Sequence, residues 1–115
     1  MNKIQIEGFV GGDPEVRNLA NGGKVVSFSV ATQESWKAGG EWKTRDTWHR
    51  VESFRAKDIE LIQAQVSKGT RVRVEGMLRI ETFGAKGARK TACKVLMAAR
   101  DHSLIVVPYE RRQAA

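Results

Sequence analysis

The sequence predicts a single domain built mainly of β-strands, with one helix in its second half. Several segments alternate between apolar and polar residues with the period of two that a strand imposes. One segment, residues 56–69, changes to the period of a helix. The length of 115 residues suits one domain around a single modest core.

Three strands are expected in the first half of the chain. The first occupies residues 3–10 and ends at the turn signal "GGDP". The second, residues 24–36, follows an Asn-Gly-Gly turn and alternates clearly over "VSFSVA". A hairpin tip at residues 37–41 then returns the chain into a third strand, which includes residues 46–54.

The only helix that the sequence predicts follows the third strand. In "AKDIELIQAQVSKG", Ile59, Ile62 and Val66 fall on one helical stripe, as expected for a face packed against a core. Gly69 stands where a residue that caps the end of a helix is expected.

Two further strands are expected after the helix. Residues 70–83 show the cleanest alternation in the chain. A core face is predicted for Val72, Val74, Leu78 and Ile80, and a charged face for Arg71, Arg73, Glu75 and Arg79. After a turn at residues 84–87 comes the last strand, in which Cys93, Val95 and Met97 oppose Lys90 and Lys94. A short apolar run from Leu104 to Val107 stops at Pro108.

Three strands, a helix and two more strands is the element order of the OB-fold, a five-stranded Greek-key barrel with its helix between the third and fourth strands. We therefore expect an all-β domain with one helix over residues 1–108. Residues 109–115 are expected to form a short extension.

The positive charge of the chain is concentrated in one segment. The net charge is +7. Residues 1–60 carry nine basic and nine acidic side chains, whereas residues 61–100 carry nine basic and two acidic ones. Such a local positive field is typical of a protein that binds a polyanion, although a merely solvated basic face is the alternative.

Several other classes of protein are excluded or unexpected. A single cysteine, Cys93, excludes an internal disulfide and is expected to be a buried structural thiol. His49 and His102 lie far apart without a metal-ligand pattern, so neither a metal nor a cofactor is expected. No apolar run is long enough for a membrane helix and no secretory signal is evident, so we expect a cytoplasmic protein.

An enzyme is not expected either. A nuclease needs clustered carboxylates to hold metal ions, but the basic segment contains only Glu75 and Glu81. They lie six residues apart on one strand, about 20 Å at the strand rise, so they cannot share an ion. The sequence contains no nucleophile elbow or phosphate-binding glycine loop.

The aromatic residues point to a specific kind of polyanion. In residues 46–54, Trp48 and Phe54 share strand parity with Arg50 and Glu52, and neither side of this stretch resembles a core. By the same parity, Phe83 lies on the charged face of its strand. A base of single-stranded nucleic acid offers such rings a flat surface, while its phosphates attract Lys and Arg.

The other two tryptophans are less clearly placed. Trp36, across the hairpin from the third strand, is expected to extend the same surface. Trp42, near the hairpin tip, is either a further stacking ring or simply exposed. For any single tryptophan, a place in the core or at an oligomer interface is the alternative.

Four segments resemble the bacterial single-stranded DNA-binding protein family in order and spacing. They are "GGDPEVR", "NGGKVVSFSVATQESW", "TWHRVESF" and "KGTRVRVEGMLR". The resemblance covers nearly all of residues 2–107. It implies an OB-fold subunit that binds single-stranded DNA without sequence preference in replication, recombination and repair. It further implies a homotetramer, or a dimer of two-domain chains. Such a protein is expected in the cytoplasm, associated with the nucleoid.

The resemblance also implies roles for individual residues. The stacking rings are expected to be Trp36, Trp48, Phe54 and Phe83, the last at a position where the family more often has Trp. His49 matches a position of subunit contacts. We expect phosphate contacts from Lys43, Arg50, Arg55, Arg71, Arg73, Arg79, Lys86, Arg89 and Lys90.

One feature departs from the family. Members that recruit repair and replication enzymes carry an acidic tail, but this sequence ends in "PYERRQAA", so tail-mediated partners are not expected. A dimeric OB protein of the primosomal replication type and an RNA-binding OB module are the alternatives. The signature "WHRV" and the aromatic set favour the single-stranded DNA-binding family.

Overall fold

The computed structural model describes residues 1–84 and 87–108, which form seven strands and one helix. In chain order the elements are β1 (Ile4–Val10), β2 (Glu15–Asn18), β3 (Lys24–Ala38), β4 (Glu41–Ser53), α1 (Ala56–Gln65), β5 (Arg71–Phe83), β6 (Lys90–Met97) and β7 (Ser103–Val106). The predicted mainly-β architecture with one helix between the third and fourth long strands is confirmed.

Five of the strands close into a barrel. Their order is β1-β3-β4-β6-β5, and β5 pairs back onto β1. All of these pairs are antiparallel except β4 with β6, which is parallel. Of the two short strands, β2 pairs with β3 and β7 with β5. Pairing all round the ring leaves the five barrel strands without an open edge along their paired lengths.

The core lies inside the barrel and is closed at one end by α1. It consists largely of valines, which suit a strand that packs tightly on one face. Examples that are almost completely buried are Val26, Val30, Val51, Val72, Val74 and Val95. Ile59 and Ile62 of α1 are also buried in this core, which confirms the helical stripe predicted for them.

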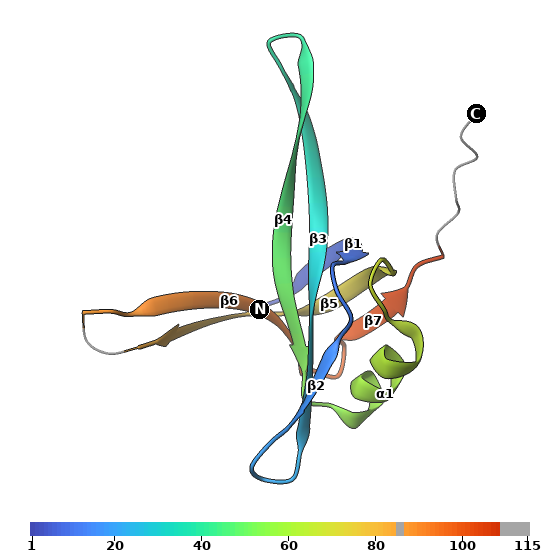
Figure 1. Cartoon of the computed structure of the whole chain (residues 1–115), viewed down its shortest axis with the longest axis vertical. Coiled ribbons are helices and arrows are strands. Elements are labelled where there is room, and N and C mark those ends of the chain that lie inside the picture. Colours follow the sequence, from blue (N-terminus) through green and yellow to red (C-terminus); the bar gives the residue numbers. More distant parts are fainter. Residues whose placement is uncertain (85–86, 109–115) are drawn as a thin grey trace.

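Two hairpins are longer than the barrel and project from it. Figure 1 shows β3 and β4 rising together as a ribbon far above the barrel, while β5 and β6 extend to one side. The core side of β3 is buried as far as Val30, and its partner β4 is buried only from Val51 onward. Both faces of each projecting ribbon are therefore accessible to solvent or to a ligand.

The projection of β5 and β6 overturns three predictions of burial. Leu78 and Ile80 have the parity of Val72 and Val74 but are 40% and 59% exposed. Cys93, which pairs with Ile80, is exposed as well and is not a buried structural thiol. Parity places a side chain on a face of the sheet, but burial also needs an opposing layer, which ends near Gly76.

The stretch 46–54 was also predicted incorrectly in one respect. It does contribute to the core, because Val51 and Ser53 are fully buried where β4 enters the barrel. Glu52, on the opposite face, is also buried, at 5% exposure. Only the half of β4 that precedes Arg50 is accessible on both faces.

Two boundaries differ from the sequence prediction. The helix ends at Gln65, and the Val66 N–H donates to the Ile62 carbonyl from an extended backbone. Gly69 is therefore not a helix cap. It lies in the next turn with φ of 91°, where its N–H donates to the Val10 carbonyl over 2.8 Å. The short strand β2 was not predicted, because "EVRN" is too short to show alternation.

Gly8 allows β1 and β3 to approach each other closely. A Cβ built on this residue would lie 2.0 Å from the carbonyl oxygen of Ala31, a distance that no real structure tolerates. Gly12, four residues later, has no atom within 4 Å of the same position. The two glycines thus form a matched pair, one crowded and one open.

We predict that Gly8→Ala destabilises the protein by on the order of 3 kcal/mol, because the added methyl group forces the two strands apart. Gly12→Ala is the control and should leave stability within about 0.5 kcal/mol. Urea denaturation followed by circular dichroism measures both. Equal midpoints for the two variants would contradict the close approach of β1 and β3.

Candidate nucleic-acid interface

The outer face of the barrel carries a row of side chains that the strand register aligns. Trp48 of β4 pairs with Ala31 of β3, Ala31 with Phe9 of β1, and Phe9 with Arg71 of β5. Paired residues project from the same face of a sheet, so all four side chains lie on one side. Two exposed aromatic rings, Trp48 and Phe9, thus share a face with an arginine.

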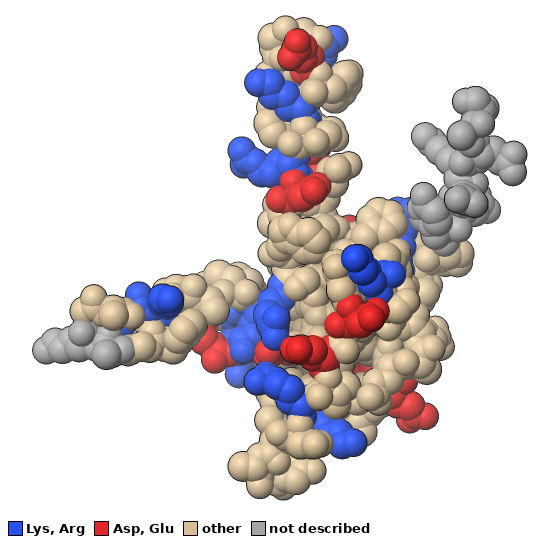
Figure 2. All heavy atoms as spheres, in the orientation of Figure 1, with Lys and Arg blue, Asp and Glu red and all other residues tan. Residues whose placement is uncertain are grey.

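A second, cationic row begins two residues further along β4. Arg50 pairs with Ser29 of β3 on one side and with Lys94 of β6 on the other, and Lys94 pairs with Arg79 of β5. Three positive side chains therefore lie side by side across three strands. Figure 2 shows Lys and Arg side chains gathered where the β3–β4 ribbon leaves the barrel, with carboxylates close to them.

Trp48 is exposed to solvent but contacts the backbone on one side. The residue is 61% exposed, yet a Cβ on Gly11 would lie 2.3 Å from the Cζ3 atom of the indole. The ring therefore rests directly against the backbone of Gly11. A hollow of about 320 Å³ adjoins it and is lined by Gly11, Gly12, Asp13, Glu15, Ser27, Phe28, Ser29, Trp48 and Arg50.

Buried Glu52 organises the charges in this region. Lys94 Nζ donates to Glu81 over 2.6 Å and to Glu52 over 2.9 Å, and these two hydrogen bonds, that to Glu81 first, raise the pKa of Lys94. The same contact with Lys94 lowers the pKa of Glu81. Because two carboxylates neutralise Lys94, the cationic row offers a ligand mainly Arg50 and Arg79.

Arg50 is held beside Trp48 by contacts along its own side chain. Its Nη2 donates to Ser27 Oγ over 3.0 Å, and its Nε lies 3.9 Å from a Glu52 oxygen. The side chain is still about half exposed, at 49%. An arginine that is oriented by neighbours and open on one side is suited to bind an anion.

Trp36 and Trp48 have opposite parity in the β3–β4 ribbon. The register pairs Trp36 with Lys43 and Trp48 with Ala31, without interruption between them. Trp36 therefore continues the inward parity of Val30, whereas Trp48 continues the outward one. That Trp36 extends the surface of Trp48 stays a prediction, because a two-stranded ribbon twists along the residues that separate the two rings.

The ring of Trp36 has its own cationic neighbours. The guanidinium carbon of Arg45 lies 5.5 Å from the ring centroid, within the range of a cation–π contact. Lys43, predicted to bind phosphate, is its cross-strand partner. Trp42 pairs with Lys37, has the parity of Trp48 and is 72% exposed.

Phe54 lies at the other end of β4, where the strand has just ended. Its ring is exposed, as predicted, and forms one wall of a groove of about 680 Å³ between α1 and the β2–β3 turn. The groove is lined by Gly22, Gly23, Lys24, Phe54, Ala56, Ile59, Glu60, Gln63 and Ala64. Phe54 thus lies on a different part of the surface from Trp48.

Phe83 is the last residue of β5 and pairs with Lys90 of β6 near the end of the projecting arm. The prediction that it lies outside the core is confirmed, because it is more than half exposed. Arg89 and Lys90 beside it are exposed too. Lys86, another predicted phosphate ligand, lies outside the described residues.

Arg71 and Arg73 lie on the outer face of β5 and share one carboxylate. Both guanidinium groups bind Glu7 of β1, Arg73 over 2.8 Å. The hydrogen bond from Arg71, followed by that from Arg73, holds the pKa of Glu7 below its ordinary value. A phosphate that binds either arginine must therefore compete with Glu7.

Two predicted residues have contacts of another kind. Arg55 is turned inward, and its guanidinium group bonds to Asp58 and to two backbone carbonyls. His49 is half-buried on the face of β4 opposite Trp48, where its Nε2 shares a hydrogen bond of 2.8 Å with Thr32. Both side chains are therefore oriented by hydrogen bonds within the chain.

Sequence reasoning missed two residues of this surface, Phe9 and Arg45. Phe9 has the parity of Gln5 and Glu7, which face outward, so the alternation of β1 already contained the signal. Arg45 gave no such signal, because its approach to Trp36 depends on the diagonal placement of two strands.

Within residues 1–84 and 87–108, no three His, Cys, Asp or Glu side chains are grouped so that they could hold a metal ion. In the same described ranges, α1 is the single helix, and it is too short and too polar to span a membrane.

The sequence profile of the single-strand binding protein family matches residues 1–102. The chain belongs to this family. It is 32% identical over 113 residues to the single-stranded DNA-binding protein of Rickettsia prowazekii, spanning 96% of this chain and 74% of that protein. The corresponding protein of Rickettsia typhi is 33% identical over 110 residues, spanning 93% and 72%.

A solved structure supports the same placement. The fold resembles a chain of the Plasmodium falciparum SSB complex with ssDNA, with a TM-score of 0.86 and 31% sequence identity. The similarity spans 94% of this chain and 96% of that one. The resemblance inferred from the sequence and the predicted OB-fold barrel are thereby confirmed.

We predict that Gly11→Ala displaces the Trp48 ring, because the added methyl group occupies the position of the indole edge. In a Trp36→Phe, Trp42→Phe background, Trp48 is the only remaining indole, and its quenching by acrylamide should increase. Gly12→Ala, which meets no neighbour within 4 Å, is the matched control. Identical quenching in both variants would contradict the contact between Trp48 and Gly11.

Proposed function

We propose that the chain binds single-stranded DNA without sequence preference and protects it during replication, recombination and repair. The observation that carries this proposal is the outer face of the barrel. There the exposed, backbone-supported ring of Trp48 lies next to the cationic row that contains Arg50 and Arg79. The proposed activity is binding alone, with no reaction step and no cofactor.

The mechanism divides between the two kinds of side chain. Lys and Arg attract the phosphodiester backbone, and each neutralised phosphate contributes about −0.7 to the slope of log affinity against log salt. Exposed rings then stack on unpaired bases, which stabilises the complex by about 1–3 kcal/mol per base. Duplex DNA keeps its bases stacked on one another, so it offers these rings no free surface.

The proposed contacts lie on the outer face of the barrel and on its two projecting hairpins. The stacking rings are Trp36, Trp48, Phe54 and Phe83, to which the register adds Phe9 and Trp42. The phosphate ligands are Lys43, Arg45, Arg50, Arg71, Arg73, Arg79, Arg89 and Lys90.

The names of similar proteins agree with this proposal. Two rickettsial relatives bear the name single-stranded DNA-binding protein, and the similar solved chain comes from a complex with single-stranded DNA. This support is independent of the strand register and of the exposure of the rings, from which the interface was built.

We also propose that the chain assembles into a homotetramer. Three apolar side chains, Leu78, Ile80 and Ile105, remain exposed in the isolated chain, and contacts between subunits would cover such groups. His49, half-buried beside Thr32, is the proposed contact between subunits. Light scattering after size exclusion separates a tetramer from the dimer that a primosomal-type protein would form.

The proposal is tested by titrating tryptophan fluorescence with oligo-dT at two salt concentrations. Binding should quench the emission, and the affinity should fall as salt rises. In a competition against labelled oligo-dT, oligo-U and duplex DNA should each displace the labelled strand more weakly than unlabelled oligo-dT does. Absence of quenching at low salt, or equal competition by duplex, would refute the function.

We predict that Trp48→Ala weakens oligo-dT binding by about 1–3 kcal/mol, because one base loses its stacking surface. Since the ring is mostly exposed, the melting temperature should change little. Trp48→Phe, which keeps a smaller ring, should recover part of the affinity. A fall in melting temperature with unchanged affinity of the folded protein would instead assign Trp48 to structure.

We predict that Glu7→Gln strengthens oligo-dT binding and steepens its salt dependence, because it releases both Arg71 and Arg73. The slope should grow by up to about 1.4 if each arginine gains a phosphate. Glu75→Gln is the control, since it removes the same charge from β5 but contacts Lys3 and Gln5 rather than an arginine. Equal effects of the two variants would mean that neither Arg71 nor Arg73 contacts a phosphate.

A further inference from the structure

Phe54 is held in place by hydrogen bonds of the residues on either side of it. Ser53 is fully buried, and its hydroxyl group donates to Asp58 Oδ2 over 2.6 Å. The Ser53 Oγ atom in turn accepts the backbone N–H of Arg55 over 3.1 Å. The backbone therefore makes a fixed bend across residues 53–55, with the Phe54 ring at its outer side.

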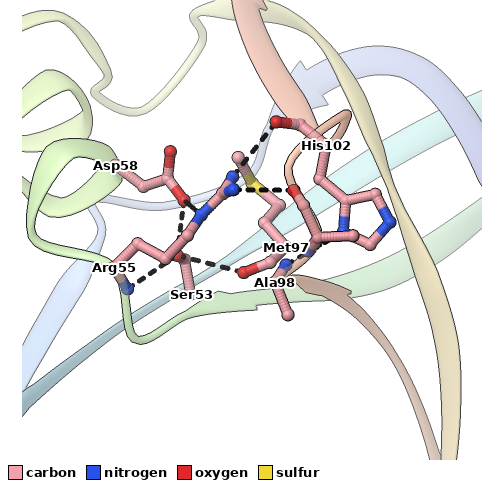
Figure 3. Close-up of polar contacts among 7 residues, drawn as sticks. Ser53, Arg55, Asp58, Met97, Ala98 and His102 are labelled. Carbon is pink, nitrogen blue, oxygen red and sulfur yellow. Dashed lines mark hydrogen bonds and ion pairs between the residues drawn. The ribbon is translucent and has the colours of Figure 1, made fainter.

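The side chain of Arg55 completes this arrangement. Its Nε donates to Asp58 Oδ2 over 2.6 Å, its Nη1 to the Ala99 carbonyl over 2.8 Å, and its Nη2 to the His102 carbonyl over 3.1 Å. Figure 3 shows the guanidinium group lying between Asp58 of α1 and the segment that follows β6. Each of its three nitrogens thus has a partner within the chain.

The two carbonyls that receive Arg55 are themselves held in place. The ring of His102 is buried, and its Nδ1 accepts the backbone N–H groups of Ala98 and Ala99, each over 2.9 Å. In addition, the His102 N–H donates to the Ala99 carbonyl. The turn between β6 and β7 is therefore a rigid support for Arg55.

This network makes a phosphate contact by Arg55 unfavourable. The Asp58 side chain is only 7% exposed, and Arg55 is its charged partner. If the guanidinium group turned outward, a buried carboxylate would lose that partner, which is strongly destabilising in general. A ligand would also have to replace two carbonyl acceptors whose geometry already matches the fork of an arginine.

We propose that Arg55 is a positioning residue for base stacking and not a phosphate ligand. Together with Asp58 and Ser53, it fixes the backbone on both sides of Phe54. The ring is thereby kept as the wall of the groove of about 680 Å³ beside α1, where a single-stranded base stacks on it. This inference rests on the proposed function and assigns a cause to the placement of one stacking ring.

The decisive variant is Arg55→Lys, which keeps the charge but cannot reach three acceptors with one planar group. If Arg55 positions Phe54, this variant should lose about fivefold or more in oligo-dT affinity, up to the full stacking effect of Phe54→Ala. Its salt dependence should match that of the wild type. If Arg55 is a phosphate ligand, the lysine should instead retain most of the affinity.

A double-mutant cycle with Phe54→Ala distinguishes positioning from a general change of fold. With the ring absent, Arg55→Lys should cause no further loss, because there is nothing left to position. An equal loss in both backgrounds would overturn the inference. Lys57→Ala is the charge control, since Lys57 is an exposed residue of α1 outside the network.

Asp58→Asn gives an independent reading in case Arg55→Lys folds poorly. It removes a negative charge, so simple electrostatics predicts tighter binding of DNA, whereas loss of the network predicts weaker binding. Circular dichroism below the melting temperature establishes that each variant is folded. Failure of the wild type to bind oligo-dT would refute the proposed function itself. Wild-type binding combined with tighter binding by Asp58→Asn would refute only the role of Arg55.

Discussion

The mismatch between long strands and a small barrel determines most of this structure. β3 and β4 have 15 and 13 residues, but the core covers only the parts that lie near Val30 and Val51. Their hydrogen bonds to each other continue to the tip, so the ribbon stays ordered beyond the core. A ribbon of this kind can carry aromatic side chains into solvent, where a buried strand would enclose them.

The same mismatch explains which features the sequence could predict. The element order, the single helix and the core valines follow from periodicity, because each depends on residues close in the chain. Leu78, Ile80 and Cys93 were misplaced because parity cannot reveal where the opposing layer ends. The opposite parities of Trp36 and Trp48 became evident only from the register between two strands, which residues 37–41 alone do not fix.

The electrostatics of the surface are more local than the net charge of +7 implies. Lys94 is neutralised by Glu52 and Glu81, Arg71 and Arg73 share Glu7, and Arg55 is directed inward. These partners lie on other strands, so composition could not identify them. A smaller set of cations, led by Arg50 and Arg79, remains open beside the stacking rings.

The central claim is that bases of single-stranded DNA lie against the exposed rings of the barrel surface and of the projecting strands. Ultraviolet crosslinking of the protein to oligo-dT, followed by mass-spectrometric mapping of the modified residues, tests it most directly. The account predicts crosslinks at Trp48, Phe54 and Phe83, and their loss at high salt. Crosslinks found only on the outward face of α1 or on β7, with none on these rings, would contradict it.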